Sequence, residues 1–413
     1  MSDSMRLVVL CPHFEPDTAP TGTVMTRIVA ELTDRGHDVH VVTSLPWYEH
    51  HAVAPGWGGT LRRVERTPWG SVTRLHPFPG VDRSNLVRRA LGFAAFSVLA
   101  LIAGLGAGGW FRRVDAVVAM SPPLTLGPTG WLISRIRRGR CVFNIQDVFP
   151  DAAVRTGAIT NRRVIAAAAW LERTTYRAVD VVTVLSDGLA ENVRQKILGA
   201  RRVVDTEVVV IPNFVDTAAI VPADRMTSYR RELGIGDGPV VMYAGNIGFS
   251  QSLDLVVGLA AARPDIDVVI NGDGSARADL EVQAAGIPNL HLVGYQPIER
   301  LSEVLASADV HVVPLRTGLG DVSVPSKTYS ILSAARPVVA SIDAGSAIDV
   351  LLTTAGAGIT VPPDDLDALL VAVDSLIADP VRATAMGTAG RAFVQREASP
   401  AAVGAEYERV LRG

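Results

Sequence analysis

The feature that most constrains this fold is a repeated pattern in which a short apolar run is followed by a loop and then by helical periodicity. Continuous apolar runs of this kind are typical of buried parallel strands. The expected strands are 7–11, 39–43, 115–120, 141–145, 181–185, 208–211, 240–244, 268–270, 290–293, 310–313 and 338–340. Strand and helix alternate as in a doubly wound sheet, and the pattern occurs twice. We therefore expect an α/β protein of two Rossmann-like domains facing across a cleft.

Proline and glycine punctuate the segment between the two sets of strands, at Pro222, Gly234, Gly236 and Gly238. We expect an N-terminal domain of residues 1–210 and a C-terminal domain of residues 211–394, with a last helix, 395–413, packing back on the first domain. Residues 1–205 carry 25 basic and 17 acidic side chains, and the remainder carries 14 and 25. Such asymmetry indicates two domains with different partners. The net charge of −3 argues against nucleic acid.

A lysine marks the start of one predicted helix, in the stretch Val324-Pro325-Ser326-Lys327-Thr328-Tyr329. Of 39 basic residues, only Lys196 and Lys327 are lysines, so the chain uses arginine nearly everywhere else. Free N–H groups at a helix start, a hydroxyl and a compact ammonium all favour a phosphate oxygen. The stretch therefore predicts a diphosphate site. A solvated lysine in the first helical turn fits the position equally well.

Two loops that follow strands of the first half carry candidate side chains. Residues 146–151 contain Asp147 and Asp151, and loops beyond the carboxyl ends of parallel strands hold the sites of such folds. Asp147 could serve as a general base or as a substrate anchor, whereas Asp151 is most simply a helix N-cap. The loop after the first strand, taken to end at Gly22, is a weaker candidate for facing an anion.

Residues 91–109 contain no charged side chain and are bracketed by Arg88-Arg89 and Arg112-Arg113. The length reaches that of a membrane-spanning candidate, but alanine and glycine dominate. A buried core helix and a helix lying in the membrane interface are the two leading interpretations, and a true span ranks behind them. The flanking arginines would favour anionic lipid.

Several short motifs, taken together in order and spacing, resemble the GT-B glycosyltransferases of family 4. In the second half these are Gly245-Asn246-Ile247-Gly248, Gly272-Asp273-Gly274, Pro314, Pro325-Ser326-Lys327 and Arg336-Pro337-Val338-Val339. In the first half they are Pro20-Thr21-Gly22, Arg35-Gly36-His37-Asp38-Val39, Asp147-Val148-Phe149-Pro150-Asp151 and Ile211-Pro212-Asn213-Phe214-Val215-Asp216. The resemblance covers nearly the whole chain. It is strongest to the bacterial branch of O-antigen and capsule N-acetyl-L-fucosaminyl transferases.

The resemblance implies a retaining, metal-independent transfer from a nucleotide-diphosphate sugar, with the donor on the C-terminal domain and the acceptor on the N-terminal one. It implies catalytic roles for Asp147 and Lys327, with Lys327 also holding the diphosphate. The residues that it implies in substrate binding are Gly22, Asn246, Gly248, Gln251, Gly272, Gly274, Tyr295, Ser323, Ser326, Lys327 and Ser330. No cofactor or metal is expected.

The chain departs from the family pattern at several positions. Many members carry a Glu-x7-Glu pair where this chain has Val322 and Ser330, and an arginine and a lysine where it has Asn246 and Gln251. These losses leave Lys327 with more of the phosphate binding, and they equally fit altered activity. Asp265-Ile266-Asp267 matches the metal-binding motif of another transferase class, but it leads into a strand and is interpreted as a solvated turn.

These observations lead to a glycosyltransferase that uses a UDP-sugar and a lipid-linked or cell-envelope glycan acceptor. We expect it in the cytoplasm, peripheral to the cytoplasmic face of the membrane, with an anionic membrane surface as a possible partner. Two other functions remain open. One is a nucleotide-sugar epimerase or hydrolase on the same fold. The other is a non-catalytic subunit of a polysaccharide assembly complex, which the lost glutamates would suit.

Overall fold

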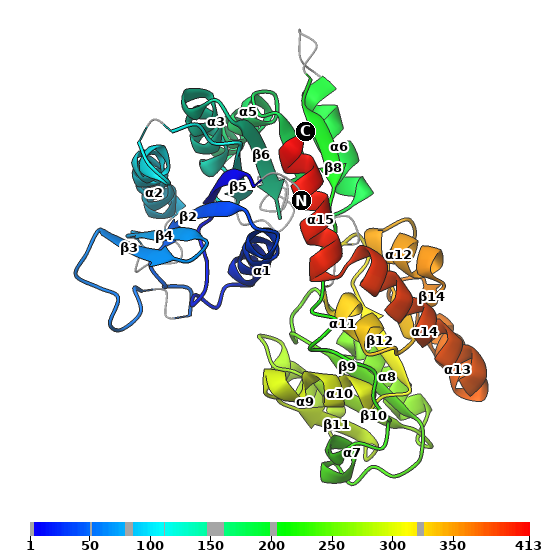
Figure 1. Cartoon of the computed structure of the whole chain (residues 1–413). Coiled ribbons are helices and arrows are strands. Elements are labelled where there is room, and N and C mark those ends of the chain that lie inside the picture. The colour runs from blue at the N-terminus through cyan, green and yellow to red at the C-terminus, as the bar shows by residue number, and fades with distance from the viewer. Residues whose placement is uncertain are drawn as a thin grey trace. The chain divides into compact units, whose positions relative to one another are not determined.

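The computed structural model describes residues 4–49, 52–78, 86–110, 112–146, 161–198, 205–319 and 326–413, with the side chains of 86–90 left out. Asp147, Asp151, Val322 and Ser323 of the predicted site lie outside these residues. The chain divides into two compact units (Figure 1). Unit 1 comprises Met1–Pro212 and Val403–Gly413, and unit 2 comprises Asn213–Ala402.

Unit 1 is built around one sheet, which has eight strands within the described residues, in the order β3-β4-β2-β1-β5-β6-β7-β8. Its strands are β1 Arg6–Leu10, β2 Asp38–Ser44, β3 Arg62–Thr67, β4 Gly70–Leu75, β5 Ala116–Ser121, β6 Arg140–Ile145, β7 Val181–Val184 and β8 Glu207–Val210. Its helices are α1 Pro20–Asp34, α2 Leu86–Gly106, α3 Leu126–Arg137, α5 Arg162–Tyr176, α6 Asp187–Leu198 and most of α15 Pro400–Arg412. All neighbouring strands are parallel except β3 and β4.

The central strands of unit 1 are buried on both faces, which explains why their sequences are apolar throughout. All six residues of β5 are buried, and β1 lies between β2 and β5. Helix α1 begins at Pro20, three residues earlier than the sequence predicts. Gly22 therefore lies in the first turn of the helix and not in the preceding loop. Proline suits this position because its missing N–H would have no partner there, and Pro20 is the first helical residue.

Helix α2 contains residues 91–106 of the charge-free segment, and one side of the helix belongs to the core. Phe96, Ala100 and Ala103 are buried in the hydrophobic cluster of unit 1. On the other side Val98 and Ile102 are 59% and 54% exposed. Within the described residues, none of the helices combines the length and apolarity needed to cross a membrane.

A buried arginine closes the carboxyl end of α2. The Arg137 guanidinium donates to the carbonyl oxygens of Gly104 at 2.9 Å, Ala107 at 2.5 Å and Arg112 at 2.8 Å. The last carbonyls of a helix lack intrahelical partners, and this side chain satisfies that of Gly104 in the last turn. It also holds Ala107 and Arg112, which lie in the segment after the helix. Arg137 is 2% exposed and contributes nothing to a basic surface.

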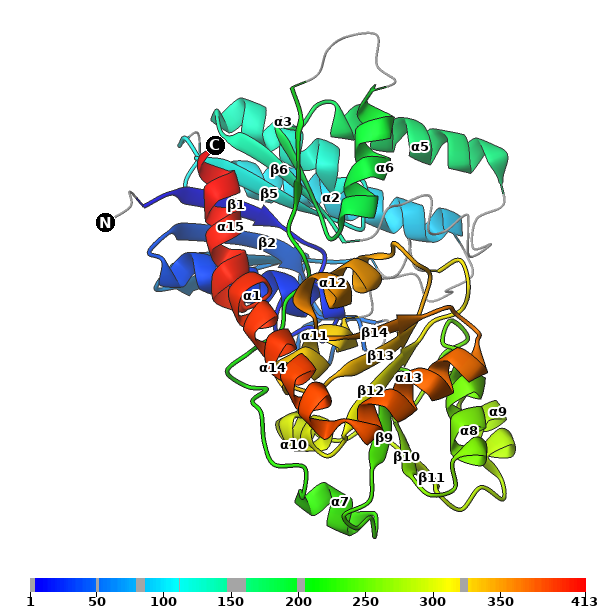
Figure 2. The same ribbon diagram turned by 90° about the vertical axis from the view of Figure 1, so that its right-hand side faces the viewer.

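The C-terminal helix α15 packs on unit 1, beside α1 (Figure 2). The Tyr407 hydroxyl is buried and accepts a 2.6 Å hydrogen bond from Asn144 in β6. A β-carbon at Gly404 would lie 2.6 Å from the Cβ of Glu31, so the two helices meet at van der Waals distance. The sequence predicts a last helix that packs on the first domain and starts at residue 395. In the structure the helix that does so, α15, starts at Pro400.

Unit 2 contains a second sheet, which has six parallel strands within the described residues, in the order β11-β10-β9-β12-β13-β14. Its strands are β9 Val240–Ala244, β10 Asp267–Asn271, β11 Leu290–Val293, β12 Val310–Pro314, β13 Val338–Ser341 and β14 Gly358–Val361. Its helices are α7 Ser228–Glu232, α8 Leu253–Ala262, α9 Arg277–Ala284, η1 Ile298–Arg300, α10 Leu301–Ala306, α11 Lys327–Ser333, α12 Ala347–Ala355, α13 Leu366–Ala378 and α14 Pro380–Glu397. The sequence pattern did not predict β14, a four-residue strand that begins with glycine.

Strand β9 shows how the sheet of unit 2 is buried. Val240 and Met242 face one hydrophobic cluster, and Val241 and Tyr243 face the other. The alternation follows from the two-residue repeat of a strand.

Unit 2 extends beyond the predicted boundary at residue 394 because α14 packs tightly on α11. The Arg391 guanidinium donates to the carbonyl oxygens of Ser333 and Thr217, and a β-carbon at Gly387 would lie 2.1 Å from the carbonyl oxygen of Ala335.

Candidate functional site

The candidate site of unit 2 lies where the strand order reverses. Strand β9 is followed along the chain by β10 on one side, whereas β12 pairs with it on the other side. Ligands of open α/β sheets bind beyond the carboxyl ends of the strands at such a switch point. The loop that starts at Gly245 leaves β9 at this edge, and Lys327 begins the helix after β12.

Lys327 reaches the carboxyl end of β9. Its Nζ donates to the Tyr243 hydroxyl at 2.5 Å and lies 4.0 Å from the centroid of the same ring, a cation–π contact. The Tyr243 hydroxyl in turn donates to the carbonyl oxygen of Asn246 at 2.5 Å. The ammonium is therefore held at the loop after β9 and not left as a solvated charge, which is the alternative that the sequence left open.

Burial lowers the pKa of the Lys327 ammonium to about 7. Desolvation disfavours the charged form of a lysine, and it is the cause of this shift. An anion bound beside the ammonium would stabilise the charged form and raise the pKa again. A phosphate bound at this position would therefore offset the desolvation of the ammonium.

Glycines at this edge allow two loops and a side chain to approach closely. A β-carbon at Gly245 would lie 2.9 Å from Lys327 Nζ, and one at Gly272 would lie 1.9 Å from the carbonyl oxygen of Gly245. A β-carbon at Gly274 would lie 2.3 Å from the carbonyl oxygen of Ile247. All three have φ between 148° and 157°. Gly272 and Gly274 thus let the loops after β9 and β10 pack together, while Gly245 leaves room for the lysine.

Asn246, Gly248 and Gln251 shape the loop after β9. The Gln251 Oε1 accepts a 3.1 Å hydrogen bond from the backbone N–H of Gly248, and Asn246 is exposed at the start of the loop. Gln251, at the position of a family lysine, therefore closes the loop on itself. Neither side chain supplies the positive charge that the family has here.

The remaining predicted donor residues are arranged around the same edge. Tyr295 is 61% exposed, and its hydroxyl donates to the carbonyl oxygen of Asp273 at 3.1 Å. Ser326 is exposed at the N-cap of α11, where its side chain makes no capping hydrogen bond, and Ser330 is half-buried one turn later. The structure brings Lys327, Asn246, Gly248, Gly272, Gly274 and Tyr295 to one edge of the sheet.

The carboxyl edge of unit 1 contains a histidine–aspartate pair that sequence reasoning did not single out. His13 Nδ1 lies 2.6 Å from Asp17 Oδ2, and both side chains are mostly buried, with 11% and 3% exposed. A carboxylate can only accept, so Nδ1 donates to Asp17, and in the neutral form of the ring Nε2 is the acceptor nitrogen. The His13 ring stacks on Trp47 at a centroid distance of 5.3 Å. The pair follows β1, at the switch point of this sheet.

Gly22 packs against this pair from the first turn of α1. A β-carbon at Gly22 would lie 2.8 Å from the Cβ of His13. The absence of a side chain at position 22 therefore lets the His13 loop pack on the first turn of α1.

The Asp265-x-Asp267 motif does not belong to the site of unit 2. Asp265 pairs with Arg263 at 2.7 Å, and Asp267 lies 2.8 Å from His291. Asp267 begins β10, so it lies at the opposite end of that strand from Gly272. Among the residues that the structure describes, no group of three or more His, Cys, Asp and Glu side chains has the arrangement of a metal site.

Three important residues were missed because their types are ambiguous in a sequence. Tyr243 reads as an ordinary core residue of an apolar strand, and only its contact with Lys327 distinguishes it. His13 and Asp17 are four residues apart in what reads as a loop, where this spacing carries no signal. The available hint was a tyrosine near the end of β9, two residues before Gly245.

Family models match both halves of the chain. Residues 21–213 match the glycosyl transferase 4-like domain, and residues 238–379 match the glycosyl transferases group 1. The chain is 24% identical to the Escherichia coli K12 protein named as the colanic acid biosynthesis glycosyl transferase WcaI, over 99% of this chain and 100% of that protein.

A second relative is a GDP-mannose-dependent alpha-(1-6)-phosphatidylinositol monomannoside mannosyltransferase of Mycolicibacterium smegmatis. It is 33% identical over 44% of this chain and half of its own length.

Two solved structures share the fold. Sucrose-phosphate synthase from Thermosynechococcus elongatus superposes with a TM-score of 0.75 at 18% identity, over 99% of this chain and 98% of the other. The Anabaena protein HepE, solved with UDP and glucose, gives 0.67 at 14% identity, over 98% and 99%. The matches to both halves, together with two doubly wound units, show that the chain belongs to the GT-B glycosyltransferases of family 4.

Proposed function

We propose that this glycosyltransferase moves a sugar from a UDP-sugar to a lipid-linked or cell-envelope glycan, with retention at the anomeric carbon and without a metal ion. In the reaction, the bond from the sugar C1 to the diphosphate oxygen breaks and a bond to the acceptor oxygen forms. The acceptor hydroxyl loses its proton. Unit 2 would bind the donor and unit 1 the acceptor.

The observation that carries the donor assignment is the Lys327 ammonium at the carboxyl end of β9, 2.5 Å from the Tyr243 hydroxyl. The leaving diphosphate gains negative charge as the C1–O bond breaks. A preformed cation in a partly desolvated position stabilises such charge more than water does. Since Asn246 and Gln251 bring no charge, Lys327 would carry most of this stabilisation.

Tyr295 and the loop from Gly272 to Gly274 are the proposed neighbours of the base and ribose. Tyr295 has an exposed aromatic face on which a base could stack. The choice of UDP is supported by the HepE structure, which contains UDP and glucose. The mannosyltransferase relative is named for GDP-mannose, so GDP is the competing nucleotide.

His13 is the proposed acceptor-side group that the structure adds to Asp147. Its ring is oriented by Asp17 and by stacking on Trp47, and in the neutral form Nε2 is the acceptor nitrogen. A neutral imidazole in this state can accept or orient the proton of a substrate hydroxyl. The aromatic wall would suit the apolar face of a sugar ring.

We also propose peripheral attachment to the cytoplasmic face of the membrane. Helices α2 and α3 pack side by side, and both expose apolar side chains. These are Leu91, Val98 and Ile102 on α2, and Leu132 and Ile136 on α3. Exposed apolar side chains next to arginines favour an anionic lipid surface. WcaI is named for colanic acid biosynthesis and the mannosyltransferase for a phosphatidylinositol acceptor, which supports an acceptor of this class.

The decisive experiment incubates UDP-, GDP- and dTDP-sugars with and without lipid-linked acceptors and separates the products. A transferase needs the acceptor for full turnover, a hydrolase releases free sugar without it, and an epimerase yields an isomeric nucleotide sugar. A purely structural subunit turns over none of them. Lys327→Ala should abolish transfer, and full activity in this variant would refute the donor assignment. Activity in the presence of EDTA tests metal independence.

A further inference from the structure

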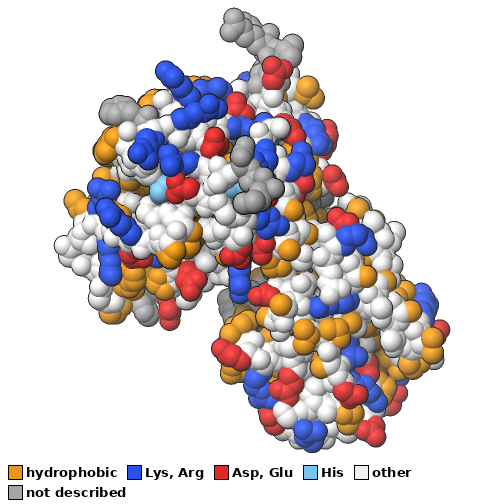
Figure 3. Space-filling model, in the orientation of Figure 1, with side chains coloured by type: hydrophobic (Ala, Val, Ile, Leu, Met, Phe, Trp, Pro, Cys, Tyr) orange, Lys and Arg blue, Asp and Glu red, His pale blue; other side chains and the backbone are white. Residues whose placement is uncertain are grey.

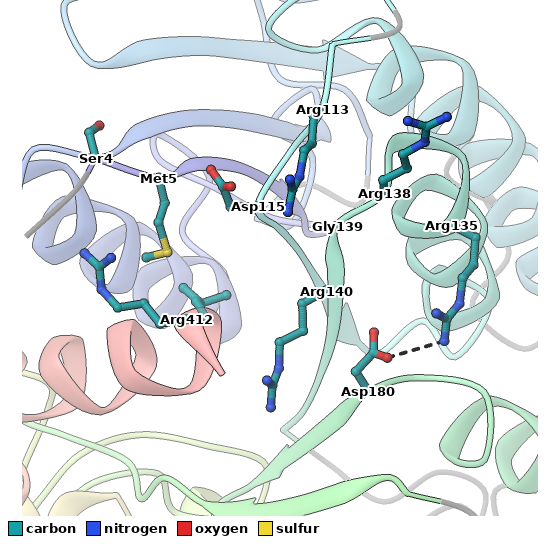
Figure 4. A pocket seen from close by; sticks show the side chains of 11 residues that line it. Ser4, Met5, Arg113, Asp115, Arg135, Arg138, Gly139, Arg140, Asp180 and Arg412 are labelled. Atoms are coloured by element: carbon teal, nitrogen blue, oxygen red, sulfur yellow. Dashed lines mark hydrogen bonds and ion pairs between the residues drawn. The ribbon is translucent and has the colours of Figure 1, made fainter.

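A hollow of about 550 Å³ lies in unit 1, away from the proposed acceptor residues. It is formed at the amino ends of the strands, by the segments that precede β1, β5 and β6 and by the end of α15. The five arginines that line it are Arg113, Arg135, Arg138, Arg140 and Arg412 (Figure 4). We call it the arginine hollow. Lys and Arg side chains are also frequent on the face of unit 1 seen in Figure 3.

The arginines come from separate elements. Arg113 comes from the loop before β5, Arg135 from the last turn of α3, Arg140 from the start of β6 and Arg412 from the last turn of α15. Arg138 points away from the centre in Figure 4. Because their backbones are fixed by the sheet and two helices, these arginines stay around the hollow without a ligand.

Both carboxylates that line the hollow already accept hydrogen bonds from backbone N–H groups. Asp115 Oδ2 accepts the backbone N–H of Arg6 at 2.7 Å, and Asp180 Oδ2 accepts that of Cys141 at 2.7 Å. Asp180 also pairs with Arg135 at 3.3 Å. These two aspartates close the starts of β1 and β6. The lining has five arginines against these two carboxylates, while Glu207 and Glu408, which are not part of the lining, pair with Arg140 at 2.9 Å and with Arg412 at 2.7 Å.

Some guanidinium groups retain donor capacity. Within the described residues, Arg113 has no hydrogen-bond or ion-pair partner and is exposed. Arg140 pairs with Glu207 through one terminal nitrogen at 2.9 Å, while its Nε is buried without a partner. Guanidinium groups with free donors bind phosphate oxygens in a bidentate manner.

The arginine hollow is separate from the transfer site. A strand rises about 3.3 Å per residue, so β1, with five residues, separates the two edges of the sheet by roughly 16 Å. A phosphate in the hollow therefore does not reach the His13 loop. The charge and size of the hollow suit a ligand larger than a single ion.

We propose that the arginine hollow is a second anion site, which binds a phosphate-bearing group of a soluble compound or of an anionic lipid. Trp110, which is 60% exposed, and Ile136, which is 50% exposed, lie after the end of α2 and in the last turn of α3. Both helix ends lie at the same edge of the sheet as the hollow. An aromatic and an aliphatic side chain beside arginines are typical of the membrane interface.

The first arm of the test measures pyrophosphate binding by calorimetry on full-length Lys327→Ala protein, in which the proposed donor site is disabled. We expect one binding event that weakens as salt rises. It should weaken by at least about tenfold in Arg113→Ala/Arg140→Ala, because two guanidinium groups that would donate charge-assisted hydrogen bonds are removed. The matched control Arg62→Ala/Arg66→Ala removes two exposed arginines of β3 and should bind normally.

The second arm measures sedimentation with vesicles of phosphatidylglycerol and phosphatidylcholine, and with phosphatidylcholine alone. Pyrophosphate binding identifies a soluble phosphate compound as sufficient. Vesicle binding without pyrophosphate binding, lost in Arg113→Ala/Arg140→Ala, identifies a lipid headgroup. The proposal is overturned if neither probe binds, or if the control variant loses binding equally. Should the double variant melt early, Arg113→Glu, a charge reversal at an exposed residue, replaces it. Both arms measure binding, so they can be interpreted even if the proposed sugar transfer is not observed.

Discussion

Replacing Lys327 by methionine should abolish donor binding and, at the same time, make unit 2 more stable at neutral pH. The two effects have one cause. The fold holds a lysine where burial lowers its pKa from the usual 10.5 to about 7. A bound anion would offset the desolvation of the ammonium, whereas the ligand-free protein is destabilised by it. Methionine has a similar length and no charge, so it keeps the packing and removes the cost.

The magnitude follows from the shift in pKa. A difference between 10.5 and about 7 corresponds to a ceiling of roughly 5 kcal/mol at 1.36 kcal/mol per unit. The hydrogen bond to Tyr243 and the contact with its ring return roughly 1–2 kcal/mol, and the side chain is only half-buried. We therefore expect Lys327→Met to stabilise unit 2 by about 1–3 kcal/mol, or about 2–4 °C per kcal/mol for a unit of this size.

The gain should depend on pH in a defined direction. Between about pH 7 and pH 10.5, the unfolded chain keeps the lysine proton and the folded chain does not, so the stability of the natural protein rises with pH. Below pH 7 both states are protonated and the cost is constant. The advantage of Lys327→Met is therefore full at pH 7 and below, and it disappears towards pH 10.5.

The assay is differential scanning calorimetry from pH 6 to pH 10, paired with UDP titration. The chain supplies a matched control in its other lysine. Lys196 Nζ lies 2.7 Å from Glu172 Oε1, and Glu172 is buried. Lys196→Met should destabilise unit 1 by about 3–5 kcal/mol, because it leaves a buried carboxylate without its ion pair. A Lys327→Met protein that melts lower at pH 7, or that gains equally at pH 7 and pH 10, would refute the reasoning.

Further substitutions test other parts of the account. Tyr243→Phe keeps the ring but loses the hydroxyl that holds the ammonium, so UDP affinity should fall several-fold in a titration; an unchanged affinity would remove Tyr243 from the site. His13→Ala should lower kcat by about 10²–10⁴ with little change in UDP affinity, whereas Asp17→Asn should have a smaller effect; parallel losses in UDP binding would contradict this division. Arg137→Met leaves several carbonyls at the end of α2 unpaired and should lower the stability of unit 1 by about 3–5 kcal/mol, while Arg135→Met, at an exposed position, should not.

The fold was predictable from the sequence because the information lies in short, local runs. A strand that is buried on both faces must be apolar at every position, as in β5, and such runs stand out. The errors occurred where local chemistry is ambiguous. Proline at position 20 was assigned to a loop but begins α1, and β14 is too short and glycine-led to resemble a strand.

The candidate site was predictable only in part, because its geometry depends on contacts between distant segments. Lys327 stood out as one of two lysines, and the glycine loops followed from the family resemblance. The reason for Gly272 is the carbonyl of Gly245 against which it packs, and no sequence pattern states this. The hydroxyl of Tyr243 meets a side chain 84 residues away. Asp147 remains a prediction, since it lies outside the described residues.

Both the rarity of lysine in this chain and the geometry around Nζ indicate that position 327 requires a lysine. Nζ has the Tyr243 hydroxyl at 2.5 Å, and a β-carbon at Gly245 would already lie 2.9 Å away. A guanidinium is planar and wider than an ammonium and carries its donors on three nitrogens. It does not fit between this ring and this backbone without moving the loop after β9. The chain prefers arginine at nearly every other basic position, so steric exclusion explains why a lysine stands here, and it makes Lys327→Arg a disruptive change despite its conserved charge.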